Sequence, residues 1–160
     1  GSWREATAAW TRCLKLDPHW LEGYLCRGMA YDSDGQYAAA RADFERAVAM
    51  QPESPEANYA MAVFLATCDD PRQRDHQRAI RHAGKTCQLS GGHYDHLAIL
   101  ALVYAHAGRF QDAVKWQTKA LADAPEGERA EIAEILELYR NERASFDDRP
   151  LAREARTWER

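Results

Sequence analysis

The sequence repeats one ladder of residues three times, and this repeat restricts the possible folds more than any other feature. In each copy the residues are separated by steps of three, four, three and five. Steps of three and four keep side chains on one face of a helix, and a proline ends the helix. The sequence therefore predicts three amphipathic helices, each with a stop. The ladders are Trp3, Ala6, Trp10, Cys13 and Pro18; Tyr37, Ala40, Phe44, Ala47 and Pro52; and Phe110, Ala113, Gln117, Ala120 and Pro125.

A companion helix is predicted ahead of the second and of the third ladder. The small residues Gly28 and Ala101 in these helices would let the paired helices approach closely, and Gly35 and Gly108 suit a tight turn with positive φ. Most of the apolar residues, chiefly Ala and Leu, have a high helix propensity, so we expect an all-α chain. The companion sets are Tyr24, Arg27, Gly28, Tyr31 and Gly35, and Leu97, Leu100, Ala101, Tyr104 and Gly108.

This pattern of large apolar residue, small residue, Tyr, turn glycine, aromatic, Ala and Pro resembles the tetratricopeptide repeat family. The period agrees, because Trp3 and Tyr37 are 34 residues apart, as are Pro18 and Pro52. The resemblance covers residues 1–125. It implies a tetratricopeptide repeat solenoid, a right-handed superhelical stack of antiparallel helix pairs, to which we add a C-terminal capping helix.

One interval departs from the period. Tyr37 and Phe110 are 73 residues apart, which is five more than two periods of 34. Asp70 and Pro71 are typical turn residues, so we expect the extra residues in a turn at 68–74. This run resembles a long-turn variant in the repeat regions of large bacterial multidomain proteins.

The intervals together predict the organisation of the whole chain, which we expect to be a fragment of a larger protein. The helix after the second repeat should begin with Ser54 as its N-cap and Pro55 in its first turn. The predicted segments are 1–18, the second helix of a truncated first repeat; 19–53, repeat two; 54–92, repeat three with its five-residue insertion; 93–125, repeat four; 126–143, the capping helix; and 144–160, a tail.

In the family, the first helix of each pair lines a concave groove, and the resemblance places a partner-binding site there. Its floor would be apolar, with acidic residues toward one edge, which suits an amphipathic helix or an extended segment. The basic clamp that some members use for acidic chaperone tails is replaced here by Leu, Met, Ala and Ile. The expected groove residues are Glu22, Leu25, Cys26, Met29, Glu56, Tyr59, Ala60, Val63, Asp95, Ala98, Ile99 and Leu102.

Two functional hypotheses follow from such a groove. The first is a protein–protein interaction scaffold that binds a partner peptide or helix. The alternative is a structural or self-association module, because an exposed apolar strip rarely stays bare. In that case the groove holds the chain's own tail or another copy, as in a homodimer.

Other partner classes have less support. A net charge of −4 does not favour nucleic acid, and no stretch approaches the roughly 18 apolar residues that span a bilayer. A candidate basic patch, opposed in sequence only by Asp75, would attract an acidic or phosphate-bearing ligand, or would simply be a solvated helix face. Its members are Arg72, Arg74, Arg78, Arg81 and Lys85.

Catalysis and cofactors are not expected. The sequence has no Gly-rich phosphate loop, nucleophile elbow or HExxH motif, so we expect no enzyme and no cofactor. His93 and His96 share a helical face but supply two metal ligands, where a structural zinc needs about four. Four scattered cysteines without a CxxC pair favour a reducing cytoplasm.

Overall fold

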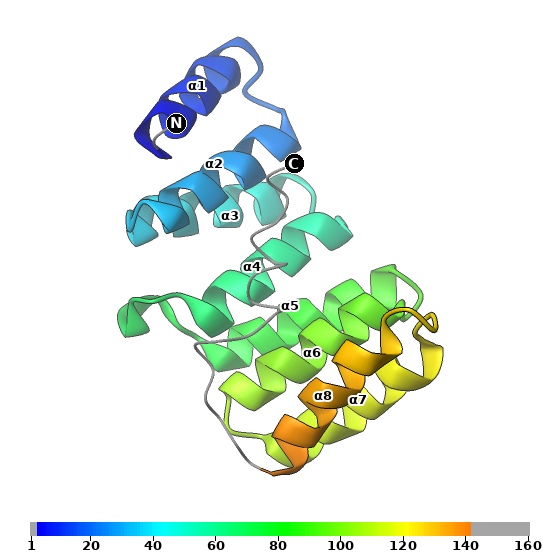
Figure 1. Cartoon of the computed structure of the whole chain (residues 1–160). Helices are drawn as coiled ribbons and strands as arrows, with labels where there is room; N and C mark the ends of the chain where they lie inside the picture. Colours follow the sequence, from blue (N-terminus) through cyan, green and yellow to red (C-terminus); the bar gives the residue numbers. More distant parts are fainter. Residues whose placement is uncertain (1–2, 142–160) are drawn as a thin grey trace.

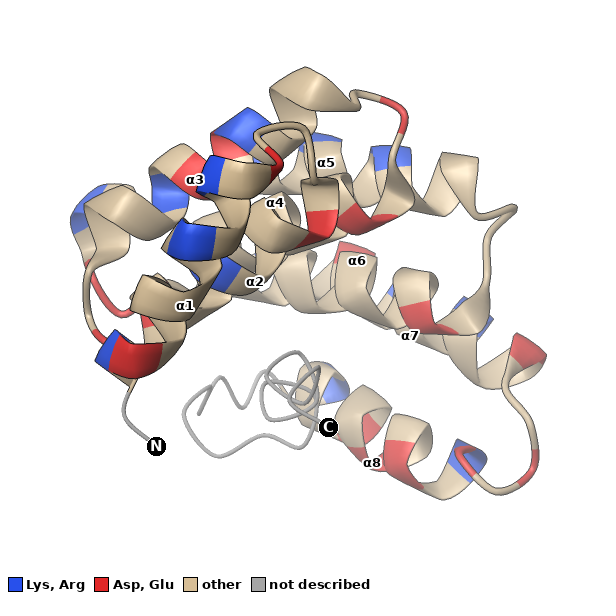
Figure 2. Ribbon diagram, turned by 90° about the horizontal axis from the view of Figure 1, so that it is seen from above, with Lys and Arg blue, Asp and Glu red and all other residues tan. Residues whose placement is uncertain are grey.

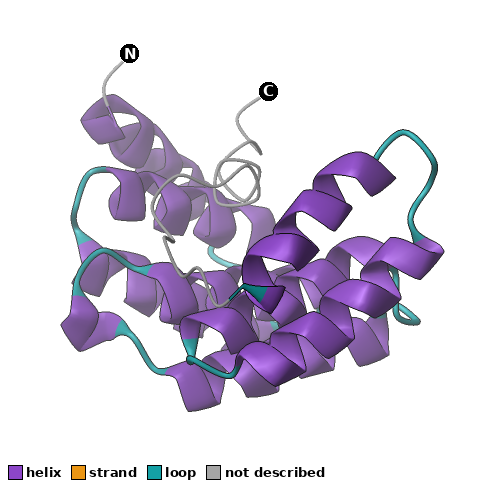
Figure 3. Ribbon diagram, turned by 60° about the horizontal axis from the view of Figure 1, so that its bottom comes forward, coloured by secondary structure: helices purple, strands orange, loops and turns teal. Residues whose placement is uncertain are grey.

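The structure, a computed structural model, describes residues 3–141. Within this part every regular element is helical, as Figure 3 shows, which confirms the all-α fold class. A single turn of 3-10 helix, η1, lies at Pro71–Gln73. The α-helices are α1 Trp3–Leu16, α2 Leu21–Ser33, α3 Tyr37–Met50, α4 Pro55–Thr67, α5 His76–Leu89, α6 Tyr94–His106, α7 Phe110–Asp123 and α8 Arg129–Arg140.

The helices form a stack of antiparallel pairs (Figure 1). Helix α2 packs along α3, α4 along α5, and α6 along α7. Successive pairs meet through α3 and α4, through α5 and α6, and through α4 and α6. Helix α1 packs on α2 at one end of the stack, and α8 packs on α7 at the other. Each helix therefore contacts mainly its neighbours in sequence, as in other solenoids.

Close approach within a pair depends on small side chains. A Cβ atom added to Gly28 of α2 would lie 2.8 Å from Cε1 of Phe44 on α3. Ala40 and Ala47, one turn on either side of Phe44, have no exposed surface. The expectation that Gly28 lets the two helices approach is thus confirmed.

The predicted turn glycines adopt the left-handed conformation. Gly35 has a φ of +75° between α2 and α3, and Gly108 has a φ of +72° between α6 and α7. A side chain would be strained at this φ, which is the reason for glycine at both positions. Each glycine lies in the short connection within a helix pair.

Helix α4 also begins where the sequence predicts. The side chain of Ser54 accepts a hydrogen bond of 3.1 Å from the backbone N–H of Ala57, and Pro55 begins the helix. Because the first N–H groups of a helix lack partners within it, this N-cap satisfies one of them. The predicted N-cap is confirmed.

The connection between α4 and α5 is longer than those of the other pairs and contains η1. It is closed by its own hydrogen bonds: the N–H of Asp75 donates to the carbonyl of Leu65 at 2.9 Å, and Nε of Arg74 donates to the carbonyl of Cys68 at 2.6 Å. At its start, Asp70 accepts from the N–H of Arg72 at 3.0 Å. The connection is therefore an ordered loop that begins and ends at the same edge of the pair.

The capping helix is shorter than the sequence predicts. We expected it at 126–143, but α8 begins at Arg129, after a turn in which the N–H of Glu128 donates to the carbonyl of Pro125. Nε of Arg129 also donates to the carbonyl of Ala124, which holds the turn against the end of α7. The helix ends at Arg140, and the predicted tail at 144–160 lies outside the described residues.

The buried side of α8 joins the core of the last pair. Ile135 and Tyr139 pack with Ala101 and Ala105 of α6 and with Ala113 of α7. Both α8 side chains are only 2% exposed. The small residues of α6 and α7 leave the space that these larger side chains fill.

Candidate functional site

The first helices of the three pairs, α2, α4 and α6, line one large concavity. Its volume is about 1780 Å³, above the roughly 300–1,000 Å³ that is usual for small-molecule sites. Trp3 and Trp10 of α1 contribute at one end of the stack, and Ile132 of α8 contributes at the other. We call this surface the concave groove. Its size suits a segment of polypeptide better than a small ligand.

All twelve residues that the sequence placed on the groove line this concavity. Met29, Tyr59 and Val63 are partly exposed, so their apolar atoms are accessible from the groove. Four others are buried and support the floor from beneath: Leu25, Ala98, Ile99 and Leu102. The structure brings the set together, and its contact with a partner remains a proposal.

Acidic side chains mark one edge of the groove. Glu22, Glu56 and Asp95 lie in the first turns of α2, α4 and α6. Because the first helices of successive pairs run in the same direction, their first turns align at one edge. Carboxylates are also favoured in a first turn by the helix dipole. The edge is therefore a consequence of the repeat itself.

Sequence reasoning missed several lining residues. Asp69 and Arg74 come from the long connection, and Glu128 and Glu131 come from the beginning of α8 and the turn before it. None of the four belongs to the first helix of a pair. No repeat position marks them, because the packing of the connection and of α8 brings them to the groove.

A polar and aromatic cluster occupies the groove at the start of α6. The hydroxyl of Tyr94 donates to the carboxylate of Glu128 at 2.7 Å, and this bond, together with burial, raises the pKa of Tyr94. The rings of Tyr59 and His96 meet edge to face, with centroids 6.1 Å apart. Burial and the neighbouring His93 lower the pKa of His96. Both effects favour the neutral form of His96.

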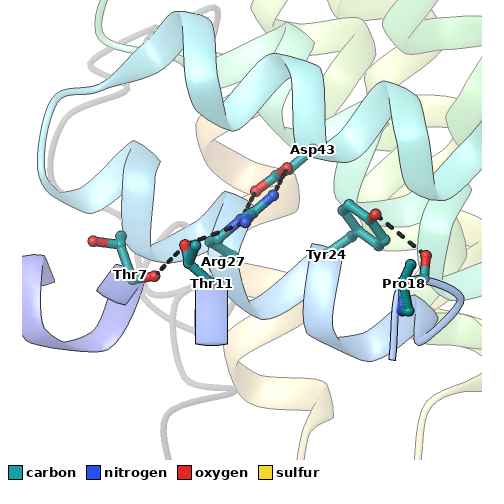
Figure 4. Close-up of polar contacts among 6 residues, drawn as sticks. All are labelled: Thr7, Thr11, Pro18, Tyr24, Arg27 and Asp43. Carbon is teal, nitrogen blue, oxygen red and sulfur yellow. Dashed lines mark hydrogen bonds and ion pairs between the residues drawn. The ribbon is translucent and has the colours of Figure 1, made fainter. Parts of the chain in front are cut away.

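Arg27 fixes the position of α2 from its other side (Figure 4). Its guanidinium forms two hydrogen bonds to Asp43 of α3, of 2.7 and 2.8 Å, and a third of 3.2 Å to Thr11 of α1. The hydrogen bonds to Asp43 raise the pKa of Arg27. The rings of Tyr24 and Tyr31 lie within 6 Å of the charge, a cation–π arrangement. One side chain therefore links three helices.

The candidate basic patch is largely neutralised, so the view that only Asp75 opposes it was wrong. Arg72 pairs with Asp70, Arg78 with Glu45, and Lys85 with Glu53. The pairs of Arg78 and Lys85 were missed because Glu45 and Glu53 lie 33 and 32 residues before these partners, whereas Asp70 lies close to Arg72 in sequence and was overlooked. Arg74 donates to a backbone carbonyl, which leaves Arg81 as the one member without a recorded partner in the described chain.

Residues 3–141 hold no metal site, disulfide or membrane-spanning helix. No group of three His, Cys, Asp or Glu side chains there is placed to hold a metal ion. All four cysteines are free, and Cys68 and Cys87 are buried. No helix in this range has both the length and the apolar character needed to cross a membrane.

Two family models match the chain, and both are described as tetratricopeptide repeat. One covers residues 21–54 and the other covers residues 72–128. The two ranges contain α2 to α3 and α5 to α7. The repeat pattern is therefore found independently on both sides of the long connection.

A relative and a solved structure show the same similarity. The chain is 29% identical over 136 residues to the tetratricopeptide repeat and J domain-containing co-chaperone DNJ1 of Cryptococcus neoformans var. grubii, covering 81% of this chain and 26% of the relative. It thus spans about a quarter of that protein. The crystal structure of MamA superposes with a TM-score of 0.64 at 22% identity, covering 88% of each chain. That likeness supports the fold alone.

Proposed function

Because this chain belongs to the tetratricopeptide repeat family, we propose that it is a protein–protein interaction module that binds a partner segment in its concave groove. The observation that carries the proposal is the groove itself, a continuous concavity with an accessible apolar floor. Met29, Tyr59 and Val63 offer that floor, and an amphipathic helix or extended peptide could place apolar side chains on it.

The helices that form the groove are already packed against each other. Arg27 links α1, α2 and α3, and His82 of α5 hydrogen-bonds the buried Asn58 of α4 at 2.9 Å. A rigid surface loses little conformational freedom on binding, so the partner supplies most of the ordering. This supports a role in holding a partner rather than in catalysis.

The cellular location belongs to the same proposal. Four free cysteines, two of them buried, fit a reducing compartment, for which the cytoplasm is our proposal. The module would then meet its partners in that compartment.

A selection from a library of 15-residue peptides tests the function. Selection on the wild-type chain should enrich peptides that bind it. These peptides should also bind the control variant Ala42→Glu, which changes an exposed position of α3 outside the groove. The same peptides should lose binding to Val63→Glu, which puts a charge on the groove floor. Equal binding by Val63→Glu, with circular dichroism showing folded helices, would contradict the proposal.

Light scattering across a range of concentrations distinguishes the partner-groove hypothesis from the self-association hypothesis. A monomer that binds the selected peptides supports a partner groove. A stable dimer that Met29→Glu dissociates would assign the groove to another copy of the chain instead.

A further inference from the structure

We propose that the concave groove selects a cationic partner segment, one in which Lys or Arg residues flank large apolar side chains. This inference rests on the proposed function and names the chemistry of the partner. It follows from how charge is distributed over the molecule.

Charge in the groove is far less balanced than in the chain. The whole sequence has 25 Asp and Glu residues against 21 Lys and Arg. Among the described lining residues there are seven carboxylates and a single Arg, Arg74. Glu128 is one of the seven, and the other six are Glu22, Asp32, Glu56, Asp69, Asp95 and Glu131.

Three of the groove carboxylates have no Lys or Arg partner within the described chain. Within residues 3–141, Glu22, Asp69 and Glu131 form no ion pair with Lys or Arg. In contrast, Glu45 on α3 and Glu53 in the following turn each pair with a basic side chain. Figure 2 shows acidic positions on α8 between two basic ones, and positions of both signs on α3. The negative charge of the chain is therefore concentrated where a partner would lie.

The groove has an apolar floor and an acidic edge, so a single partner segment would need both apolar and cationic side chains to fit it. The apolar floor favours large hydrophobic anchors, whose burial drives association. The acidic edge and the carboxylates near α8 favour cations beside those anchors and repel an acidic segment. Burial with a neighbouring Glu22 raises the pKa of the groove thiol Cys26, as expected where anionic groups are unfavourable.

The acidic groove also opposes the chemistry of the acidic chaperone tails that other family members hold. A carboxylate-rich peptide would meet Glu22, Glu56 and Asp95 along one edge, with Arg74 as the one guanidinium in the described lining. Electrostatic attraction of a cationic segment would in contrast speed encounter, and this effect falls as salt is added.

Three synthetic 15-residue peptides test the inference. They share one helical stripe of Leu and Trp and carry Lys, Gln or Glu at all other positions. Fluorescence anisotropy on the full chain should give the tightest binding for the Lys peptide, by about tenfold or more over the Glu peptide at 50 mM NaCl. The difference should shrink at 500 mM NaCl because screening weakens exposed charges.

A matched pair of variants locates the effect. Glu22→Gln with Asp95→Asn removes two groove charges and should weaken the Lys peptide about tenfold. Glu134→Gln with Asp123→Asn removes the same charge from exposed positions outside the groove and should change binding less than twofold. Equal effects of the two pairs would show a nonspecific influence of net charge and overturn the inference.

The remaining outcomes are distinct. If the Glu peptide binds as tightly as the Lys peptide, the cationic preference is wrong while groove binding stands. If none of the three peptides binds, the proposed function itself is contradicted. A concentration-dependent dimer that excludes the Lys peptide would assign the groove to a second copy and overturn the partner proposed here.

Discussion

The carboxylate of Asp43 on α3 holds the guanidinium of Arg27 on α2 by two parallel hydrogen bonds, with side chains only 8% and 17% exposed. An ion pair so far from water is costly to break, because the charge left behind keeps its desolvation penalty without its partner. The pair lies between the helices that support one end of the groove.

Asp43→Asn should therefore destabilise the chain by about 3 kcal/mol, the lower end for a broken buried pair, because Arg27 retains some contact with water. Urea denaturation followed by circular dichroism measures the change. Glu137→Gln, which breaks the exposed pair with Arg140, should cost less than about 0.5 kcal/mol. Similar losses in the two variants would contradict the assigned role of Arg27.

Two glycines within helices predict opposite effects of the same substitution. Gly28→Ala should destabilise by about 1–3 kcal/mol, because the new methyl group would overlap Phe44 and force α2 and α3 apart. Gly84→Ala on α5 should stabilise by about 0.5–1 kcal/mol, since a Cβ there meets no atom within 4 Å and Ala favours helix. Thermal denaturation of both variants checks the signs. A stabilised Gly28→Ala variant would show that the helices are not in close contact there.

The buried thiols predict a loss of stability at high pH. Burial raises the pKa of Cys68 and of Cys87 from 9.0 to about 11, so each thiol holds its proton more tightly in the folded chain. Their contribution to stability is full below about pH 9 and is lost as the pH rises through about 11. Urea midpoints between pH 8 and pH 11 should fall more steeply for the wild type than for Cys68→Ala with Cys87→Ala. Parallel curves would contradict this assignment.

The N-cap of α4 provides a local measure of helix stability. Ser54→Ala should cost about 1 kcal/mol, whereas Ser54→Gly should cost a few tenths, because glycine leaves the orphan N–H groups open to water. The two unfolding free energies, compared under identical conditions, test this. If the alanine variant were as stable as the wild type, the hydrogen bond from the Ala57 N–H to Ser54 would contribute nothing to stability.

The features that the sequence predicted best are those that recur in every repeat. Gly28, Gly35 and Gly108 recur at fixed positions because each repeat needs the same close contact or the same turn, and the structure confirms all three. The twelve groove residues line the concavity for a similar reason, since one helical face points the same way in every pair.

What the sequence could not supply depends on contacts between distant segments. The pairing of Glu45 with Arg78 and of Glu53 with Lys85 joins different repeats, so local charge counting mistook neutralised side chains for a basic patch. The late start of α8 at Arg129 follows from how the preceding turn is held against α7. Neither the ion pairs nor the start of α8 corresponds to a repeating pattern in the sequence, so neither could be predicted from it.

The self-closed connection between α4 and α5 has a consequence for how such chains vary. The bond from Asp75 to Leu65 returns the backbone to the place that a shorter turn would reach, and Arg74 ties the loop to Cys68. Helix α5 therefore packs along α4 as the other second helices pack along their partners. Chain length is uncoupled from superhelix geometry at this point: residues can be gained or lost there while the spacing of the groove helices is preserved.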